Sequence, residues 1–154
     1  MESRMFQKYR FKFYLNASHY IIINGSQGAV HPHTWEFVLE ILLLKKEFVE
    51  FAVFEKSIDR YFQPFQNQTL NNIPPFDTIL PTLENILERF GEDIRQILRE
   101  EGGELTQIEG SETPTRTYII SYQQDEQFSD GIARMTQDSM DDMFTTMLNN
   151  ATRH

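Results

Sequence analysis

Two stretches of the sequence alternate apolar and polar residues, and this pattern restricts the fold more than any other feature. Over residues 9–19 the odd positions carry Tyr9, Phe11, Phe13, Leu15, Ala17 and His19. Over residues 31–43 they carry His31, His33, Trp35, Phe37, Leu39, Ile41 and Leu43. A period of two with many aromatic residues is typical of strands that bury one face. We therefore expect two long strands, separated by the turn-forming residues 24–28.

The remaining residues predict helices and further strands in mixed order. Apolar residues recur at helical spacing over 55–63 and again after Thr82, a favourable N-cap, as far as the Gly102-Gly103 pair. An irregular connection is expected over 64–81. Strands are expected over 48–54, 104–110 and 115–122, with a turn over 110–114, and an amphipathic helix from about residue 129. This order predicts an α+β fold, in which helices cover one face of an antiparallel sheet.

Length and charge limit the classes of partner. The 154 residues suit one domain. A net charge of −9 disfavours nucleic-acid binding, because an acidic surface repels phosphates. No segment approaches the roughly 18 apolar residues of a membrane span, and the first residues lack the pattern of a secretory signal. We expect a cytoplasmic protein that binds neither nucleic acid nor membrane.

Histidines are the candidate metal ligands, because the sequence contains no cysteine. His31 and His33 are two residues apart on one predicted strand, so their side chains share a face. If the two long strands pair, His19 joins them, and three histidines with an open fourth position are typical of catalytic zinc. The alternative is that all three are ordinary polar residues at strand ends and in a loop.

Four short motifs occur in order between residues 5 and 122, at Leu15–His19, His31–Trp35, Pro81–Asn85 and Glu112-Thr113. They resemble the 6-pyruvoyl-tetrahydropterin synthase family, which includes the bacterial 6-carboxytetrahydropterin synthases of queuosine biosynthesis. The corresponding family patterns are F-x-A-x-H, H-G-H-x-Y, P-T-x-E-N and E-T. Each motif is short, and their order and spacing carry the resemblance.

The resemblance implies a tunnelling fold over residues 1–122, in which two helices lie on one face of a four-stranded antiparallel sheet. Residues 123–154 would form a C-terminal amphipathic helical extension. It also implies a homo-oligomer, a hexamer built from two trimers. The zinc ligands of the family correspond to His19, His31 and His33. The residues of the family that bind the substrate, a pterin or a purine of similar edge, correspond to Glu112 and Thr113, and the Glu112 carboxylate would anchor the heterocycle.

The sequence departs from the family at the positions of its proton relay. Gln27 replaces a cysteine, and Gln66 and Asn67 replace an aspartate and a histidine. Amides do not act as general bases. Three alternatives follow. In the first, the chain is a zinc-dependent lyase that acts on a pterin side chain, with the metal assisting proton transfer. In the second, it is a catalytically inactive protein that binds a pterin or purine. In the third, it is an oligomeric scaffold without metal.

Overall fold

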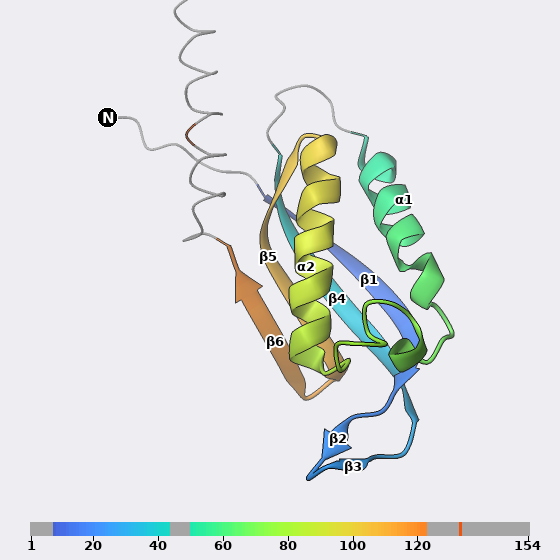
Figure 1. Cartoon of the computed structure of the whole chain (residues 1–154). Coiled ribbons are helices and arrows are strands. Elements are labelled where there is room, and N and C mark those ends of the chain that lie inside the picture. Colours follow the sequence, from blue (N-terminus) through green and yellow to red (C-terminus); the bar gives the residue numbers. More distant parts are fainter. Residues whose placement is uncertain (1–7, 44–49, 123–132, 134–154) are drawn as a thin grey trace, which may run out of the picture. The chain divides into compact units, whose positions relative to one another are not determined.

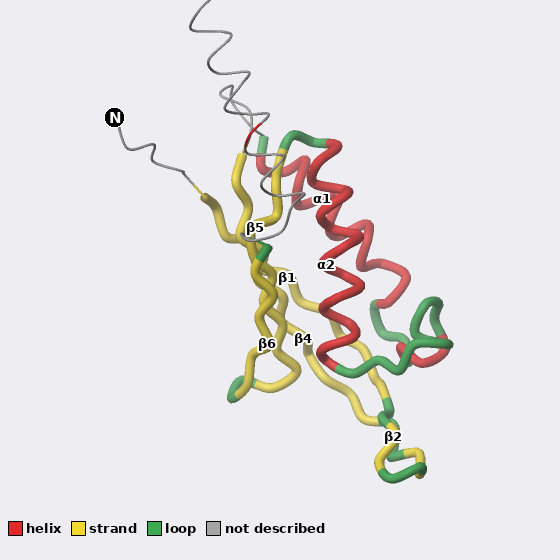
Figure 2. The backbone as a smooth tube through the Cα atoms, turned by 60° about the vertical axis from the view of Figure 1, so that its left-hand side comes forward, coloured by secondary structure: helices red, strands yellow, loops and turns green. Residues whose placement is uncertain are grey.

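The fold is a four-stranded antiparallel sheet with two helices on one face (Figures 1 and 2). The computed structural model describes residues 8–43, 50–122 and 133. The sheet order is β1-β4-β5-β6, and a hairpin of β2 and β3 lies between β1 and β4 in the chain. The bounds are β1 Lys8–His19, β2 Ile22–Ile23, β3 Ser26–Gln27, β4 His31–Leu43, α1 Phe51–Phe62, α2 Leu83–Glu100, β5 Gly103–Thr113 and β6 Arg116–Ser121.

This architecture confirms the predicted α+β fold with two helices on one face of the sheet. All but residue 133 of the predicted C-terminal helix lies outside the described residues, so that helix and the division at residue 122 stay predictions. No helix in the described part of the chain is both long and apolar enough to cross a membrane.

Strands β1 and β4 pair residue for residue, from Lys8 opposite Leu42 to His19 opposite His31. Odd residues of one strand therefore face odd residues of the other, as the alternation predicts, and they point toward the helices. Pro32 lies opposite Ser18 and does not interrupt the pairing. The side chains of this face that lose all contact with solvent are Leu15, Trp35, Phe37, Leu39 and Ile41.

Two of the sequence predictions are wrong, the strand over 48–54 and the turn over 110–114. Phe51–Phe54 forms the start of α1 instead of a strand, because Phe54 begins a buried helical stripe that continues with Ile58 and Phe62. The predicted turn over 110–114 is also wrong. Strand β5 continues through Thr113, and a register shift between Gly110 and Thr113 accommodates one extra residue of β5 opposite β6.

Helix α2 packs over β5 and begins where the sequence predicts. The Thr82 hydroxyl accepts a hydrogen bond from the Asn85 backbone N–H at 3.2 Å, which caps the helix. Gly110 of β5 permits close contact, because a Cβ at this position would lie 2.6 Å from Leu87 Cδ1. Phe90 packs edge-on against Phe37, with ring centroids 5.4 Å apart, and so joins the helix to the sheet core.

An edge segment, residues 66–71, lies along the outer side of β1. The Asn67 N–H donates to the Asn16 carbonyl at 2.6 Å, and the Ser18 N–H donates to the Gln68 carbonyl at 2.9 Å. Asn67 has a φ of 59°, in the left-handed region that asparagine tolerates better than most residues. The edge segment therefore satisfies backbone groups of β1 on the side where, among the described residues, no other strand pairs with it.

Two side-chain amides of the edge segment extend this pairing. The Gln66 side chain accepts from the Asn16 N–H and donates to the Tyr14 carbonyl, both at 3.0 Å. The Asn71 side chain likewise accepts from the Tyr20 N–H and donates to the Tyr20 carbonyl, both at 3.0 Å. At both positions the backbone presents one N–H and one carbonyl, so the side chain must accept one hydrogen bond and donate another. An amide does both, and a carboxylate only accepts.

We predict that Gln66→Glu destabilises the fold. Glutamate has the same shape, but it loses the donor to the Tyr14 carbonyl and places a carboxylate oxygen there instead. Because Gln66 is half-buried, we expect a loss of about 1 kcal/mol, or about 2–4 °C in Tm, measured by thermal denaturation. The control is Gln68→Glu, the same change at an exposed residue. Equal Tm values for the two variants would contradict the prediction.

Candidate metal and ligand site

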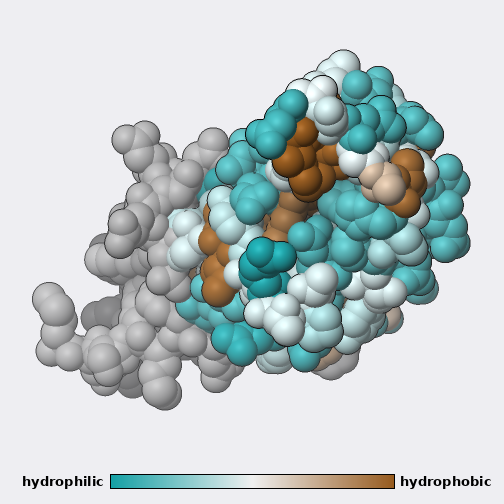
Figure 3. Space-filling view, turned by 90° about the horizontal axis from the view of Figure 1, so that it is seen from below, coloured by the Kyte–Doolittle hydropathy of each residue, from teal (hydrophilic) through white to brown (hydrophobic). Residues whose placement is uncertain are grey.

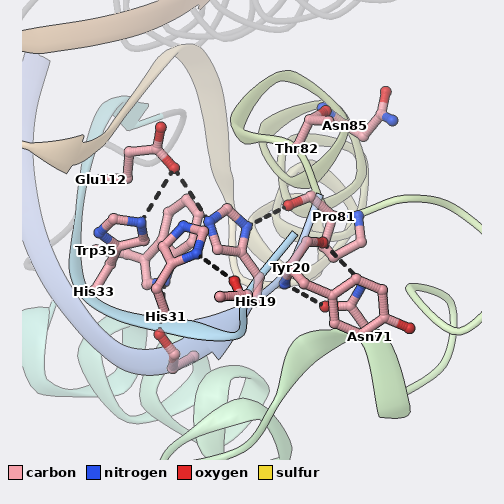
Figure 4. Close-up of polar contacts among 12 residues, drawn as sticks. His19, Tyr20, His31, His33, Trp35, Asn71, Pro81, Thr82, Asn85 and Glu112 are labelled. Atoms are coloured by element: carbon pink, nitrogen blue, oxygen red, sulfur yellow. Dashed lines mark hydrogen bonds and ion pairs between the residues drawn. The ribbon is translucent and has the colours of Figure 1, made fainter. Parts of the chain in front are cut away.

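Three histidines converge at one end of the β1–β4 pair (Figure 4). His19 lies opposite His31, and His33 lies opposite Ala17. The centroids of the three rings are 4.5, 4.7 and 5.1 Å apart. One potential ligand atom from each ring lies within 4.8 Å of the other two. The structure therefore brings together the three histidines that the sequence singles out.

Backbone carbonyls orient two of these rings. His19 Nδ1 donates to the carbonyl of Pro81 at 2.7 Å, and His31 Nδ1 donates to the carbonyl of Ala29 at 2.9 Å. A carbonyl only accepts, so each Nδ1 carries a hydrogen and each Nε2 of the neutral ring presents a lone pair. This arrangement is the one that metal-binding histidines commonly adopt.

Trp35 supports the histidines from the core. Its ring centroid is 4.9 Å from that of His19 and 5.3 Å from that of His33, in both cases edge to face. The tryptophan is fully buried, and its indole N–H donates to the Ala17 carbonyl at 3.3 Å. Because the indole is fixed at both its apolar body and its polar edge, it limits the orientations open to the two imidazoles.

Glu112, near the end of β5, faces the histidines (Figure 4). Its Oε2 lies 3.6 Å from His19 Nε2 and 3.7 Å from His33 Nε2. Both Nε2 atoms are buried and have no hydrogen-bond partner in the described part of the chain. Burial lowers the pKa of His19 and of His33, and the charge of Glu112 only partly opposes this effect. Both rings therefore favour the neutral form, which binds metals.

Two hollows adjoin the histidines. The larger, of about 460 Å³, is lined by His19, His31 and Glu112, by the start of α2 and by residues 116–118 of β6. The second, of about 430 Å³, is lined by His33 together with neutral polar groups, among them Asn16, Ser18, Thr34 and Asn67. Volumes of this size are typical of small-molecule sites.

Residues at the relay positions of the family do not gather around the histidines. Gln27 is exposed in β3 and lines neither hollow. Gln66 is hydrogen-bonded to β1, and only Asn67 lines a hollow, the one beside His33. Thr113 Oγ1 lies 3.3 Å from Thr115 Oγ1, a contact within the β5–β6 turn rather than with a histidine.

The β2–β3 hairpin, which carries Gln27, extends beyond the sheet (Figure 1). Figure 3 views this end of the molecule, where apolar patches interrupt a mainly hydrophilic surface. Exposed apolar side chains of the hairpin and the residues after it include Ile22, Ile23 and Val30. The family's cysteine position thus lies on an exposed projection in this chain.

Sequence reasoning missed the groups that orient the rings. The carbonyls of Ala29 and Pro81 belong to the backbone, so no pattern of side chains in the sequence predicts their role as hydrogen-bond acceptors. The only signal for Pro81 is its place in the Pro81–Asn85 motif. Arg116, which lines the larger hollow, has no motif of its own in the sequence.

Comparisons with known proteins agree with this fold. A sequence model of the family described as 6-pyruvoyl tetrahydropterin synthase matches residues 8–123. No curated protein matches the chain. Solved structures similar in fold include a 6-pyruvoyl tetrahydropterin synthase from Caenorhabditis elegans, at 14% identity and a TM-score of 0.64 over 79% of this chain and 99% of that one. An uncharacterized protein from Wolinella succinogenes matches at 12% identity and a TM-score of 0.57, over 77% and 99% of the two chains. The match to the family over most of the sequence shows that the chain belongs to the 6-pyruvoyl tetrahydropterin synthase family.

Proposed function

We propose that this chain binds a zinc ion through His19, His31 and His33 and binds a pterin, or a purine of similar edge, beside it. The observation that carries the proposal is the set of three converging imidazoles, two of which present buried Nε2 atoms without a hydrogen-bond partner in the described part of the chain. A buried polar atom without a partner is costly, and a metal ion removes that cost.

The residues present fit zinc. All three ligands are nitrogen donors, which zinc accepts readily, and three histidines are the protein ligands of catalytic zinc in other enzymes. The carbonyls of Ala29 and Pro81 fix the tautomer that leaves Nε2 free on His31 and His19. When bound, zinc would supply Lewis-acid polarisation of a substrate oxygen.

Glu112 is suited to bind the heterocycle. A carboxylate offers two acceptor oxygens, which match the adjacent ring N–H and amino donors of a pterin or guanine edge. Glu112 lines the larger hollow next to His19 and His31, and family membership favours a pterin as the ligand. Thr113 follows it at the end of β5, and we propose that it completes this binding edge.

Binding without turnover is the function that the geometry supports best. Gln27 is exposed and lines neither hollow beside the histidines, and Gln66 uses both ends of its amide to bind the β1 backbone. Neither of these side chains, nor that of Asn67, accepts a proton as a general base. The second candidate is lyase-type chemistry on a tetrahydropterin side chain, which family membership and the three-histidine geometry favour.

We predict that His31→Ala or His33→Ala abolishes stoichiometric zinc binding, measured as metal content after dialysis and as affinity in competition with a chromophoric chelator. Loss of an outer-shell partner alone weakens metal binding roughly 10–100-fold, so loss of a ligand should cost at least as much. Gln27→Ala, at an exposed residue of β3, is the control and should keep the wild-type affinity. Unchanged metal content in both histidine variants would refute the metal site.

We predict that the zinc-loaded protein binds dihydroneopterin triphosphate without converting it. Binding would be followed by calorimetry and product formation by chromatography, on the same samples. Glu112→Ala should weaken pterin binding at least about tenfold, because the ligand donors lose a charged acceptor worth roughly 1.5–3 kcal/mol. Product formation by the wild type that needs zinc would instead establish the lyase.

We also propose that the chain forms a homo-oligomer, a hexamer of two trimers. Strand β6 is an edge of the sheet with no partner strand on its outer side in the described part of the chain, and an edge strand of this kind is available for pairing with another copy. Light scattering coupled to gel filtration should give the mass of a hexamer rather than that of the 18.2 kDa single chain. A monomeric mass at micromolar concentration would contradict this prediction.

A further inference from the structure

Strand β6 brings a guanidinium group to the larger hollow beside the histidines. Tyr118 lies opposite Gly110 of β5, and Gly110 faces helix α2, where an added Cβ would lie 2.6 Å from Leu87 Cδ1. Side chains alternate along a strand, so Arg116, two residues before Tyr118, lies on the same helix-facing side of the sheet. Both residues accordingly line the hollow that Glu112 also lines.

The Arg116 side chain forms no hydrogen bond or ion pair with any residue in the described part of the chain. Glu112 and Glu84 line the same hollow, but neither pairs with it. The Glu112 carboxylate lies instead beside two histidine nitrogens, at 3.6 and 3.7 Å. The hollow therefore presents a carboxylate acceptor and a set of guanidinium donors that do not neutralise each other directly.

The strand register places these two groups on adjacent strands. Arg116 lies opposite Thr113, the residue that follows Glu112 in β5. Long side chains reach diagonal neighbours on the adjacent strand of a sheet, and arginine is one of the longest side chains. Arg116 is thus positioned to donate to a ligand atom next to those that Glu112 binds.

A heterocycle with a pterin or guanine edge carries three polar groups in a row, an amino group, a ring N–H and a carbonyl oxygen. Binding by Glu112 uses the first two as donors and leaves the carbonyl oxygen without a donor. A guanidinium supplies donors and no acceptor, so it suits this oxygen. In a diamino heterocycle a second amino group replaces the carbonyl, and its hydrogens would face the hydrogens of the guanidinium.

We propose that Arg116 donates to the carbonyl oxygen of the bound heterocycle and makes the site selective for an oxo group over an amino group at this position. The inference rests on the pterin site proposed above and specifies its ligand class, the 2-amino-4-oxo pteridines and the purines with the same edge. Two donors that face each other leave both without an acceptor, and this mismatch is what excludes the diamino compounds.

The test compares Arg116→Ala with Arg60→Ala in the full-length protein in the presence of Zn²⁺. Arg60 is an exposed arginine in the last turn of α1 and lines neither hollow. The probes are pterin and 2,4-diaminopteridine, which differ in the group at C4 and in the adjacent ring N–H. Their affinities are measured by titration of ligand fluorescence, and thermal denaturation checks that both variants are folded.

We expect Arg116→Ala to weaken pterin binding at least about tenfold and to leave the affinity for 2,4-diaminopteridine unchanged. Arg60→Ala should keep both wild-type affinities. The change in preference is decisive, because the preference of the wild type also includes the contribution of the N–H that Glu112 binds.

An unchanged preference in Arg116→Ala, whether both affinities stay or both fall equally, would overturn the inference and leave the pterin site intact. A wild type that binds neither compound would refute the proposed pterin site itself, and the inference with it.

Discussion

The in-register pairing of β1 with β4 is the constraint on which the rest of the structure depends. It places every odd residue of both strands on the helix-facing side, so one pattern produces both the aromatic core and the histidine cluster. A shift of one residue would turn all of these side chains to the opposite face. The site is therefore an extension of the core: Trp35 belongs to the core and touches the rings of His19 and His33.

Irregular segments of the chain determine the orientation of the histidine rings, which the sheet alone does not set. The sheet determines where the histidines lie, but the carbonyls of Ala29 and Pro81 determine which nitrogen each ring presents. Asn71 binds both backbone groups of Tyr20, the residue after His19, and so holds the end of β1 in place. The long connection between α1 and α2 thus contributes to the geometry of the site even though it supplies no candidate metal ligand in the described residues.

The sequence predicted the parts that follow from periodicity and missed those that depend on contacts between distant residues. Alternation located β1 and β4, and Thr82 marked the start of α2. The apolar run over 48–54 suits a strand or a helix equally, and only packing against the sheet decides for α1. The turn-forming residues over 110–114 led to a predicted turn, whereas the chain forms a bulge there. The bulge keeps Glu112 within β5, facing the histidines.

The replacement at position 66 links the fold to the question of catalysis. The resemblance assigns this position to a catalytic aspartate, but in this chain the side chain must donate to one backbone group of β1 and accept from another. An ionised carboxylate only accepts, so it cannot satisfy both groups. Position 66 therefore cannot serve the edge of β1 in this way and also relay a proton. This chain uses it for the edge, so Gln66 supplies no proton relay beside the histidines and Glu112.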